Sequence, residues 1–257
     1  MKTVHRVLDP NRPADIARGS CTLAVMTKAP RAGEVKTRLV PPLTHDEAAQ
    51  LNSSFLRDVG AAISAAAAER IARGVAVYTP FGTEAAYENI LPEEFFLIAQ
   101  RGHNFGDRLI FAAEDLFTVG FASVCLINSD SPTVPAENFS QAAELLHLPG
   151  DRIVLGPSDD GGYYLIGLKK LHREIFEHID WSTERVLDQT LQRAAEIGAE
   201  VKLLPSGYDV DDRATLARLC SELLGRNTSR DCGIAPNTRK FLMEIVKREG
   251  RGRIWPA

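Results

Sequence analysis

Residues Thr22–Leu39, TLAVMTKAPRAGEVKTRL, combine a short apolar run with a loop rich in Pro, Gly, Lys and Arg. The apolar run, Thr22–Met26, has the length of a buried β-strand. Strand-length and helix-length patterns alternate after it, which predicts an α/β protein with a mainly parallel sheet covered on both faces. Ligands of such sheets collect at the carboxyl ends of the strands, so the loop after Met26 is the first candidate site.

The expected strands follow one another with helical patterns between most of them. Further strands are expected at Val75–Tyr78, Phe96–Ala99, Ser123–Asn128, Arg152–Leu155, Tyr163–Leu168 and Val201–Leu204. A helix is expected from Thr44, with Glu47 completing a capping box, and others at Phe105–Leu116, Glu137–His147, Ser182–Ile197, Asp212–Leu224 and Thr238–Arg248. The strands between positions 151 and 168 are too close for a helical crossover, which predicts an antiparallel pair. Residues 1–20 lack periodicity and are expected to form a flexible arm before a single domain, 21–257.

Composition bounds the class of protein. The chain has 257 residues, a net charge of −4 and 44% hydrophobic residues, which fits a globular protein and argues against general nucleic-acid binding. No stretch approaches the roughly 20 apolar residues of a membrane span, and the polar start lacks the apolar core of a secretory signal. The four cysteines, Cys21, Cys125, Cys220 and Cys232, form no CxxC pair, so a reducing, cytoplasmic location is expected.

The loop from Pro30 to Leu39 has the residue types of a phosphate site. Its basic residues, counting one just before it, are Lys28, Arg31, Lys36 and Arg38. Gly33 permits close backbone approach, and the cations balance phosphate charge. Neither GxxxxGK[ST] nor GxGxxG is present. The alternative is an ordinary solvated basic loop.

Carboxylates follow two of the later strands. Asp130 stands where an apolar strand breaks, and Asp209 and Asp211 precede a helix that Asp212 can cap. Mg²⁺ or Mn²⁺ is usually held by one or two protein carboxylates together with phosphate oxygens. One of the later pair therefore completes a predicted metal site with Asp130, and the alternative is that all of them serve turns and caps.

Two other segments carry candidate binding residues. The turn Gly156–Tyr164 places carboxylates, glycines and an aromatic ring where a hydroxyl-rich acceptor would fit, or it is a plain hairpin. The acceptor candidates are Asp159, Asp160, Gly161, Gly162 and Tyr163. Trp181 could add to this pocket, although a tryptophan before a helix more often belongs to the core or to a hydrophobic staple. After the strand at Phe96–Ala99, Gly102 allows close approach and Arg108 could meet a phosphate.

Several motifs occur in the order found in a known family. They are MTKAPRAGEVKTRL, NFGDRL, LINSDSP, GPSDDGGYYLIGL, DWST and DVDD, within about residues 21–220. In these the chain resembles an uncharacterised bacterial family labelled as glycosyltransferases or nucleotide-diphospho-sugar transferases of the GT-A fold. It is more distantly similar, through KTRL, to the guanylyltransferases of molybdenum-cofactor and phospholactate metabolism. The resemblance implies a Rossmann-like three-layer α/β/α sandwich with a mixed sheet.

The resemblance also implies roles for individual residues. Gly33, Lys36 and Arg38 match phosphate-loop positions, with Lys28 and Thr37 beside them, and Gln100 and Gly102 would lie near the base or ribose. Asp130 and Asp211 match metal-ligand positions, with Asp209 as their neighbour.

The chain departs from the family pattern in two places. Its loop has fewer glycines than that of nucleotidyltransferases, and Asn128-Ser129-Asp130 holds one carboxylate where GT-A enzymes usually have Asp-x-Asp.

These observations predict a metal-dependent transferase acting on a nucleotide donor. The leading hypothesis is nucleotidyl transfer from an NTP to a phosphorylated sugar or small acid, with Lys36, Arg38 and Asp130 as catalytic residues. The alternatives are a glycosyltransferase that uses a nucleotide-sugar donor and a non-catalytic nucleotide sensor. The role of residues 221–257 stays open between covering the core and contacting a second copy in a homodimer.

Overall fold

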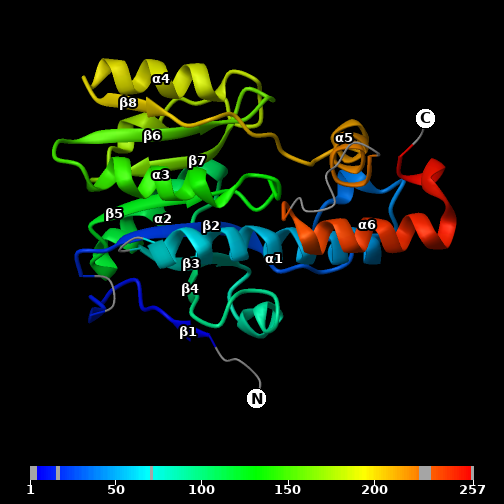
Figure 1. Ribbon diagram of the computed structural model, residues 1–257. Coiled ribbons are helices and arrows are strands. Elements are labelled where there is room, and N and C mark those ends of the chain that lie inside the picture. Colours follow the sequence, from blue (N-terminus) through cyan, green and yellow to red (C-terminus); the bar gives the residue numbers. More distant parts are fainter. Residues whose placement is uncertain (1–4, 16–17, 70–71, 226–232, 256–257) are drawn as a thin grey trace.

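A computed structural model describes residues 5–15, 18–69, 72–225 and 233–255. Within them, one mixed sheet has the strand order β1-β4-β3-β2-β5-β7-β6-β8 (Figure 1). The strands are β1 (Arg6–Val7), β2 (Cys21–Lys28), β3 (Ala72–Thr79), β4 (Phe96–Ala99), β5 (Ser123–Ile127), β6 (Arg152–Pro157), β7 (Tyr163–Leu168) and β8 (Glu200–Leu203). Every neighbouring pair is parallel except those that β7 makes with β5 and β6. The carboxyl ends of the parallel strands therefore meet at one edge of the sheet.

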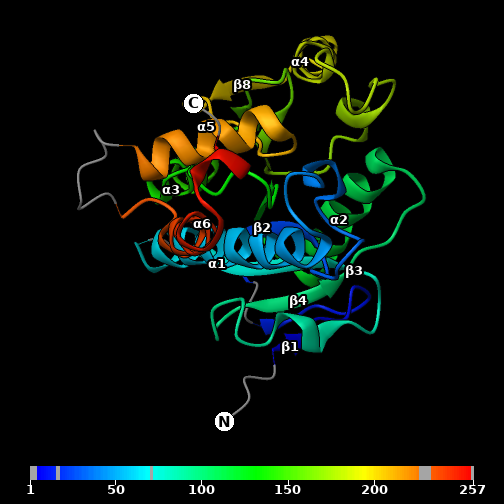
Figure 2. The ribbon, with the colours of Figure 1, turned by 90° about the vertical axis from the view of Figure 1, so that its right-hand side faces the viewer.

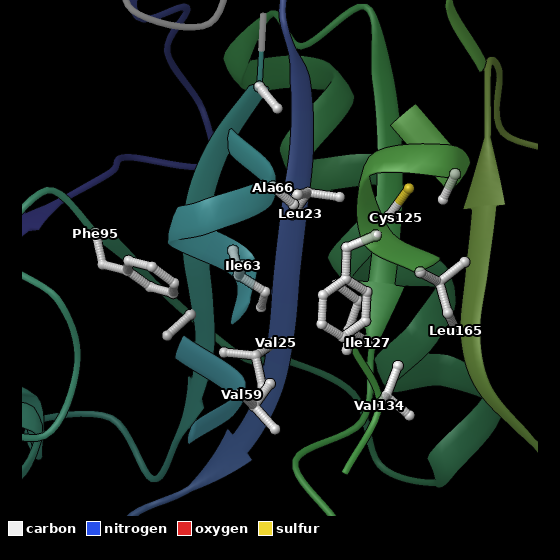
Figure 3. Close-up of a cluster of buried hydrophobic side chains, with 14 of the residues drawn as sticks. Leu23, Val25, Val59, Ile63, Ala66, Phe95, Cys125, Ile127, Val134 and Leu165 are labelled. Atoms are coloured by element: carbon white, nitrogen blue, oxygen red, sulfur yellow. The ribbon is translucent and has the colours of Figure 1, made fainter. Parts of the chain in front are cut away.

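Helices cover both faces of the sheet. Helices α1 (His45–Glu69) and α3 (Ala136–His147) pack on one face, and α2 (Phe105–Val119) and α4 (Val186–Glu196) on the other. Figure 3 shows the first face, where Val59 and Ile63 of α1 lie against Leu23 and Val25 of β2. The hydrophobic effect selects this arrangement because both faces of the central strands are apolar.

A third apolar cluster lies beyond the carboxyl edge. Helices α5 (Arg213–Leu224) and α6 (Pro236–Glu249) pack there, and α6 runs along α1 (Figures 1 and 2). Leu39, from the end of the basic loop, is fully buried in this cluster together with Val210 and Leu216. This packing brings the basic loop against the segment that follows β8.

Buried polar contacts connect α6 to α1. The Asp58 carboxylate of α1 accepts hydrogen bonds from the backbone N–H groups of Asn237 and Thr238, at 3.0 and 2.8 Å. These N–H groups belong to the first turn of α6, where they have no partner within the helix. At the start of α1, Glu47 bonds Thr44 and pairs with Arg248 and Arg253. The C-terminal elements are thus fastened to α1 by charge as well as by apolar contact.

The predicted α/β class with a mixed, mainly parallel sheet is confirmed, including the antiparallel pair of β6 and β7. The structure differs from the prediction at residues 5–8, which were expected to belong to a flexible arm. Arg6–Val7 pairs with β4, and Leu8 is buried. A two-residue edge strand is too short to show periodicity, which is why the pattern missed it. Residues 1–4 and 16–17 of that arm lie outside the described residues, as does Cys232.

Helix α4 begins at Val186 and not at the predicted Ser182. Residues 181–185 form turns and a bend, in which Ser182 has a positive φ of 65° and the Thr183 hydroxyl donates to the Asp180 carbonyl. Two short 3₁₀ turns, Glu84–Tyr87 and Arg173–Phe176, also lie between the main elements. Among the described helices, none has the length and apolar character that crossing a membrane requires.

Candidate phosphate and metal site

The basic loop turns sharply at Lys36. This residue has φ 49° and ψ 35°, a left-handed conformation unusual for a residue with a side chain, and a single 3₁₀ turn, Thr37–Leu39, follows it. Burial of Leu39 in the third cluster anchors the far end of the loop. The backbone thereby directs the Lys36 side chain towards the segments after β5 and β8.

The Lys36 ammonium is held by three oxygen atoms. Nζ lies 2.7 Å from Asp130 Oδ1, 2.9 Å from Asp211 Oδ1 and 2.8 Å from the Val210 carbonyl oxygen. The side chain is 5% exposed. Burial by itself would lower the pKa of Lys36, but the charges of Asp130 and Asp211 outweigh it, and the pKa is raised. Lys36 is therefore a fixed, fully bonded cation at the carboxyl edge.

The other basic residues of the loop are more open to solvent. Arg38 is 74% exposed and donates from Nη2 to Asp211 Oδ2 at 2.9 Å. Lys28 pairs with Glu34 and bonds its backbone carbonyl. Gly33 has a positive φ of 78° with open space around it. Arg38 and Lys28 are thus exposed beside the buried Lys36, and each is paired with a carboxylate.

Asp130 is positioned by contacts between two strand ends. Its backbone carbonyl accepts a bond from the Val210 N–H at 2.9 Å, which joins the segment after β5 to the segment after β8. Its backbone N–H donates to Asn128 Oδ1, and Ser129 Oγ donates to its carboxylate. Because parallel strands end at the same edge, Asp130 and Asp211 reach one cation from distant parts of the chain.

Asp209 has different surroundings from Asp211. Its Oδ1 accepts hydrogen bonds from Asn128 Nδ2 at 2.8 Å, Ser131 Oγ at 2.5 Å and Ser158 Oγ at 3.2 Å. Burial, together with the nearby charge of Asp130, raises the pKa of Asp209 to about 6. Asp209 therefore ties three loops together, whereas Asp211 faces the cation.

The Asp130 and Asp211 carboxylates offer oxygen ligands to a divalent metal. Both carboxylates already face a single positive charge, the Lys36 ammonium, and a backbone carbonyl oxygen completes its surroundings. Hard oxygen donors of this kind suit Mg²⁺ or Mn²⁺, which usually add phosphate oxygens and water. Across the described residues, no three His, Cys, Asp or Glu side chains are grouped as a metal cage. The pair therefore fits a metal that shares its coordination with a ligand.

The turn after β6 lies next to this cluster. The Asp159 carboxylate pairs with Arg218 of α5 at 2.7 Å, and Asp160 Oδ1 accepts from the Gly162 N–H at 3.0 Å. Gly161 has φ 84°, and a Cβ built there would lie 2.1 Å from the Glu184 carbonyl oxygen. Asp160 contributes to the raised pKa of Asp209, so the turn lies within electrostatic reach of the metal-ligand candidates.

The two aromatic acceptor candidates serve packing. Tyr163 contacts the second core cluster and its hydroxyl oxygen is buried. Trp181 packs edge-to-face on Phe105, with 5.1 Å between ring centroids, and lies against Gly106 at the start of α2. Trp181 thus joins the turn before α4 to α2.

The segment after β4 lies on the other side of the basic loop. The Gln100 N–H bonds the Tyr78 carbonyl at 2.7 Å, and Gly102, with φ 118°, packs on the backbone of Arg108. Arg108 is partly exposed. Arg101, which was not predicted, forms a bidentate pair with Asp115 and also contacts Glu114.

The structure thus brings Lys36, Arg38, Asp130, Asp209 and Asp211 into one cluster. Sequence reasoning missed the residues that hold the cluster in shape, namely Asn128, Ser131, Ser158 and the carbonyl of Val210. A weak signal was present, since Asn-Ser-Asp-Ser after a buried strand is dense in hydrogen-bonding side chains.

Comparison with known proteins bears on the family and the fold. Residues 62–183 match a family described as "Uncharacterized protein conserved in bacteria (DUF2064)". No curated protein matches the chain in sequence. A solved structure described as a "putative nucleotide-diphospho-sugar transferase" from Desulfovibrio desulfuricans G20 has 29% identity and a TM-score of 0.76, covering 91% of this chain and 98% of that one.

Two further solved structures are less similar. One is 4-diphosphocytidyl-2C-methyl-D-erythritol synthase from Anaerococcus prevotii DSM 20548, with 10% identity and a TM-score of 0.48 over 77% of this chain and 94% of that one. The other is glucosyl-3-phosphoglycerate synthase from Mycobacterium tuberculosis, with 11% identity and a TM-score of 0.47 over 84% and 87%. The similarity to the Desulfovibrio structure shows that this chain has the fold of the nucleotide-diphospho-sugar transferase superfamily. Its residues 62–183 match the DUF2064 family.

Proposed function

We propose that this chain is a metal-dependent transferase that binds a nucleotide donor by its phosphates at the Lys36, Asp130 and Asp211 cluster. The observation that carries the proposal is the buried Lys36 ammonium between two carboxylates from separate strand ends. A phosphate site needs positive charge, and a metal shared with phosphate needs one or two carboxylates. Both lie here at the carboxyl edge, where ligands of open α/β sheets bind.

Asp130 and Asp211 would hold the Mg²⁺ or Mn²⁺. When bound, the metal would neutralise negative charge on the donor phosphates. The chain's own residues orient the donor, with Arg38 exposed beside Asp211 and Gly33 leaving room for close backbone approach. Electrostatic stabilisation and positioning suffice for phosphoryl-group chemistry, so the reaction needs no protein nucleophile.

The favoured reaction is nucleotidyl transfer from an NTP to a phosphorylated sugar or small acid. The basic residues of the loop favour it, because a triphosphate and an acceptor phosphate bring more negative charge than a nucleotide-sugar does. Lys36 and Arg38 would stabilise the charge that develops as an acceptor phosphate attacks in line and pyrophosphate leaves. Gln100 and Gly102, on the far side of the loop, would contact the base or ribose.

A second candidate is glycosyl transfer from a nucleotide-sugar. It is favoured by the description of the Desulfovibrio structure as a nucleotide-diphospho-sugar transferase. Asp160 is then the better base for an acceptor hydroxyl, because Asp159 already pairs with Arg218. The two reactions differ in the product released: pyrophosphate in the first, a nucleoside diphosphate in the second.

Thermal unfolding with the four NTPs and with UDP- and GDP-sugars, each with and without Mg²⁺ or Mn²⁺, tests the proposal. A donor at 100 times its Kd stabilises the fold by about 2.7 kcal/mol, which raises Tm by about 5–10 °C at this chain length. Asp130→Asn should lose the metal-dependent part of that shift, and Asp188→Asn, an exposed carboxylate of α4, should keep it. Nucleotide stabilisation that survives Asp130→Asn unchanged would indicate a sensor. The proposal fails if no nucleotide or nucleotide-sugar shifts Tm with either metal.

A further inference from the structure

The Lys36 ammonium lies between Asp130 and Asp211, the two residues that would hold the metal. It uses all three of its N–H donors, on Asp130 Oδ1, Asp211 Oδ1 and the Val210 carbonyl. It also lies 5.4 Å from the centre of the Phe55 ring. Exposed lysines on loops usually reach into water, whereas this one is enclosed and bonded.

We infer that Lys36 and the divalent metal exchange places, so that the metal enters only together with donor phosphates that receive the lysine. This inference rests on the proposed function and concerns how the same site is loaded. The ammonium bonds Oδ1 of both carboxylates, and a metal bound to the same two oxygens would lie against it and be repelled by it. Metal entry therefore requires the ammonium to leave.

The ammonium cannot leave alone. Its departure without a metal leaves Asp130 without its cation and Asp211 with only the exposed Arg38. The ammonium itself would lose three acceptors and needs a new anion. A metal bound to phosphate supplies both requirements at once, a cation for the carboxylates and an anion for Lys36.

The backbone of Lys36 agrees with such an exchange. A residue with a Cβ held at φ 49° and ψ 35° is in a sparsely populated region, which the surrounding contacts must maintain. Gly33, three residues earlier in the loop, has open space around it, so the loop has room for a shift of its backbone. By thermodynamic linkage, metal and phosphate should each raise the affinity for the other.

Mn²⁺ binding measured by electron paramagnetic resonance tests the exchange, with Mn²⁺ alone and with inorganic pyrophosphate as probes. The wild type should bind Mn²⁺ alone weakly, and Lys36→Met should bind it at least tenfold more tightly. Pyrophosphate should strengthen Mn²⁺ binding to the wild type far more than to the variant, after correction for the complex that forms in solution. Lys36→Gln provides the same measurement if Lys36→Met does not fold, as judged by circular dichroism.

Two controls make the result specific. Lys202→Met removes one positive charge from β8, where the ammonium pairs with Glu200, and should leave Mn²⁺ affinity unchanged. Adding Asp130→Asn to Lys36→Met should abolish the gain. The inference is overturned if the wild type binds Mn²⁺ alone as tightly as Lys36→Met, or if Lys202→Met shows the same gain. If no protein binds Mn²⁺, with or without pyrophosphate, the proposed metal dependence fails and the inference fails with it.

Discussion

The Asp209 carboxylate accepts a 2.5 Å hydrogen bond from the Ser131 hydroxyl, and this bond joins the segment after β8 to the segment after β5. The same oxygen also accepts bonds from Asn128 and Ser158. Asp209 thus holds together the three loops that surround Asp130. Burial and the nearby Asp130 charge raise the pKa of Asp209, although the hydrogen bond from Ser131 opposes the shift.

Burial raises the pKa of Asp209 from 3.8 to about 6, so the folded state retains this proton at pH values where the unfolded chain has lost it. The contribution of Asp209 to the free energy of unfolding should therefore fall by up to about 3 kcal/mol as pH rises from about 4 to about 6. Above pH 6 it should stay at this lower value. Asp209→Asn removes the titration. The variant should gain stability relative to the wild type between pH 4 and pH 7, measured by urea unfolding in EDTA. A difference between the two proteins that is constant with pH would contradict this.

Lys36 and Arg38 both contact Asp211 but should contribute very differently to stability. Lys36 is 5% exposed and Arg38 is 74% exposed. Lys36→Met leaves the partly buried Asp130 without its cation and Asp211 with only the exposed Arg38, and should cost about 3 kcal/mol at pH 7. Arg38→Ala removes an exposed ion pair and should cost less than about 1 kcal/mol. Denaturant midpoints of the two variants give the comparison, and similar losses would show that Lys36 is not held as described.

Asp58 should be important for the packing of α6 on α1. Its carboxylate accepts the N–H groups of Asn237 and Thr238 and is 4% exposed. Asp58→Ala leaves these buried donors without a partner, at a cost of about 2–4 kcal/mol. Gln50→Ala, an exposed position on the same helix, should change stability by less than about 0.5 kcal/mol. Urea unfolding curves for both variants test the contrast, and an equal effect would rule out the capping role.

Gly161 and Gly162 should differ sharply in their tolerance of alanine. A Cβ on Gly161 meets the Glu184 carbonyl oxygen at 2.1 Å, and the residue has φ 84°. A Cβ on Gly162 meets only the flexible side chain of Asp160, at 3.2 Å. Gly161→Ala should cost more than about 2 kcal/mol, since the left-handed backbone alone costs about 1–2 kcal/mol. Gly162→Ala should cost less than about 1 kcal/mol. Calorimetric Tm values of the two variants test this difference. Similar losses of stability would mean that the turn does not pack as the structure shows.

Much of the fold could be predicted because its signals are local. The run Val124–Ile127 is apolar throughout, as a strand buried on both faces must be, and the short spacing between β6 and β7 excludes a helical crossover. The first strand escaped detection because Arg6–Val7 is held by its partner β4 and not by any pattern of its own. The start of α4 was misplaced because a turn with a positive φ at Ser182 precedes it.

The sequence by itself determined which residue types gather at the site. Lys36, Asp130 and Asp211 each follow a strand, and parallel strands end at one edge, so their proximity follows from the order of elements. Only the tertiary structure decided how they are paired. Burial of Leu39 beside Val210 brings the loop onto the segment after β8, and the Lys36 ammonium thereby lies between the two carboxylates. That contact depends on packing between residues far apart in the chain, and no local pattern encodes the resulting distances.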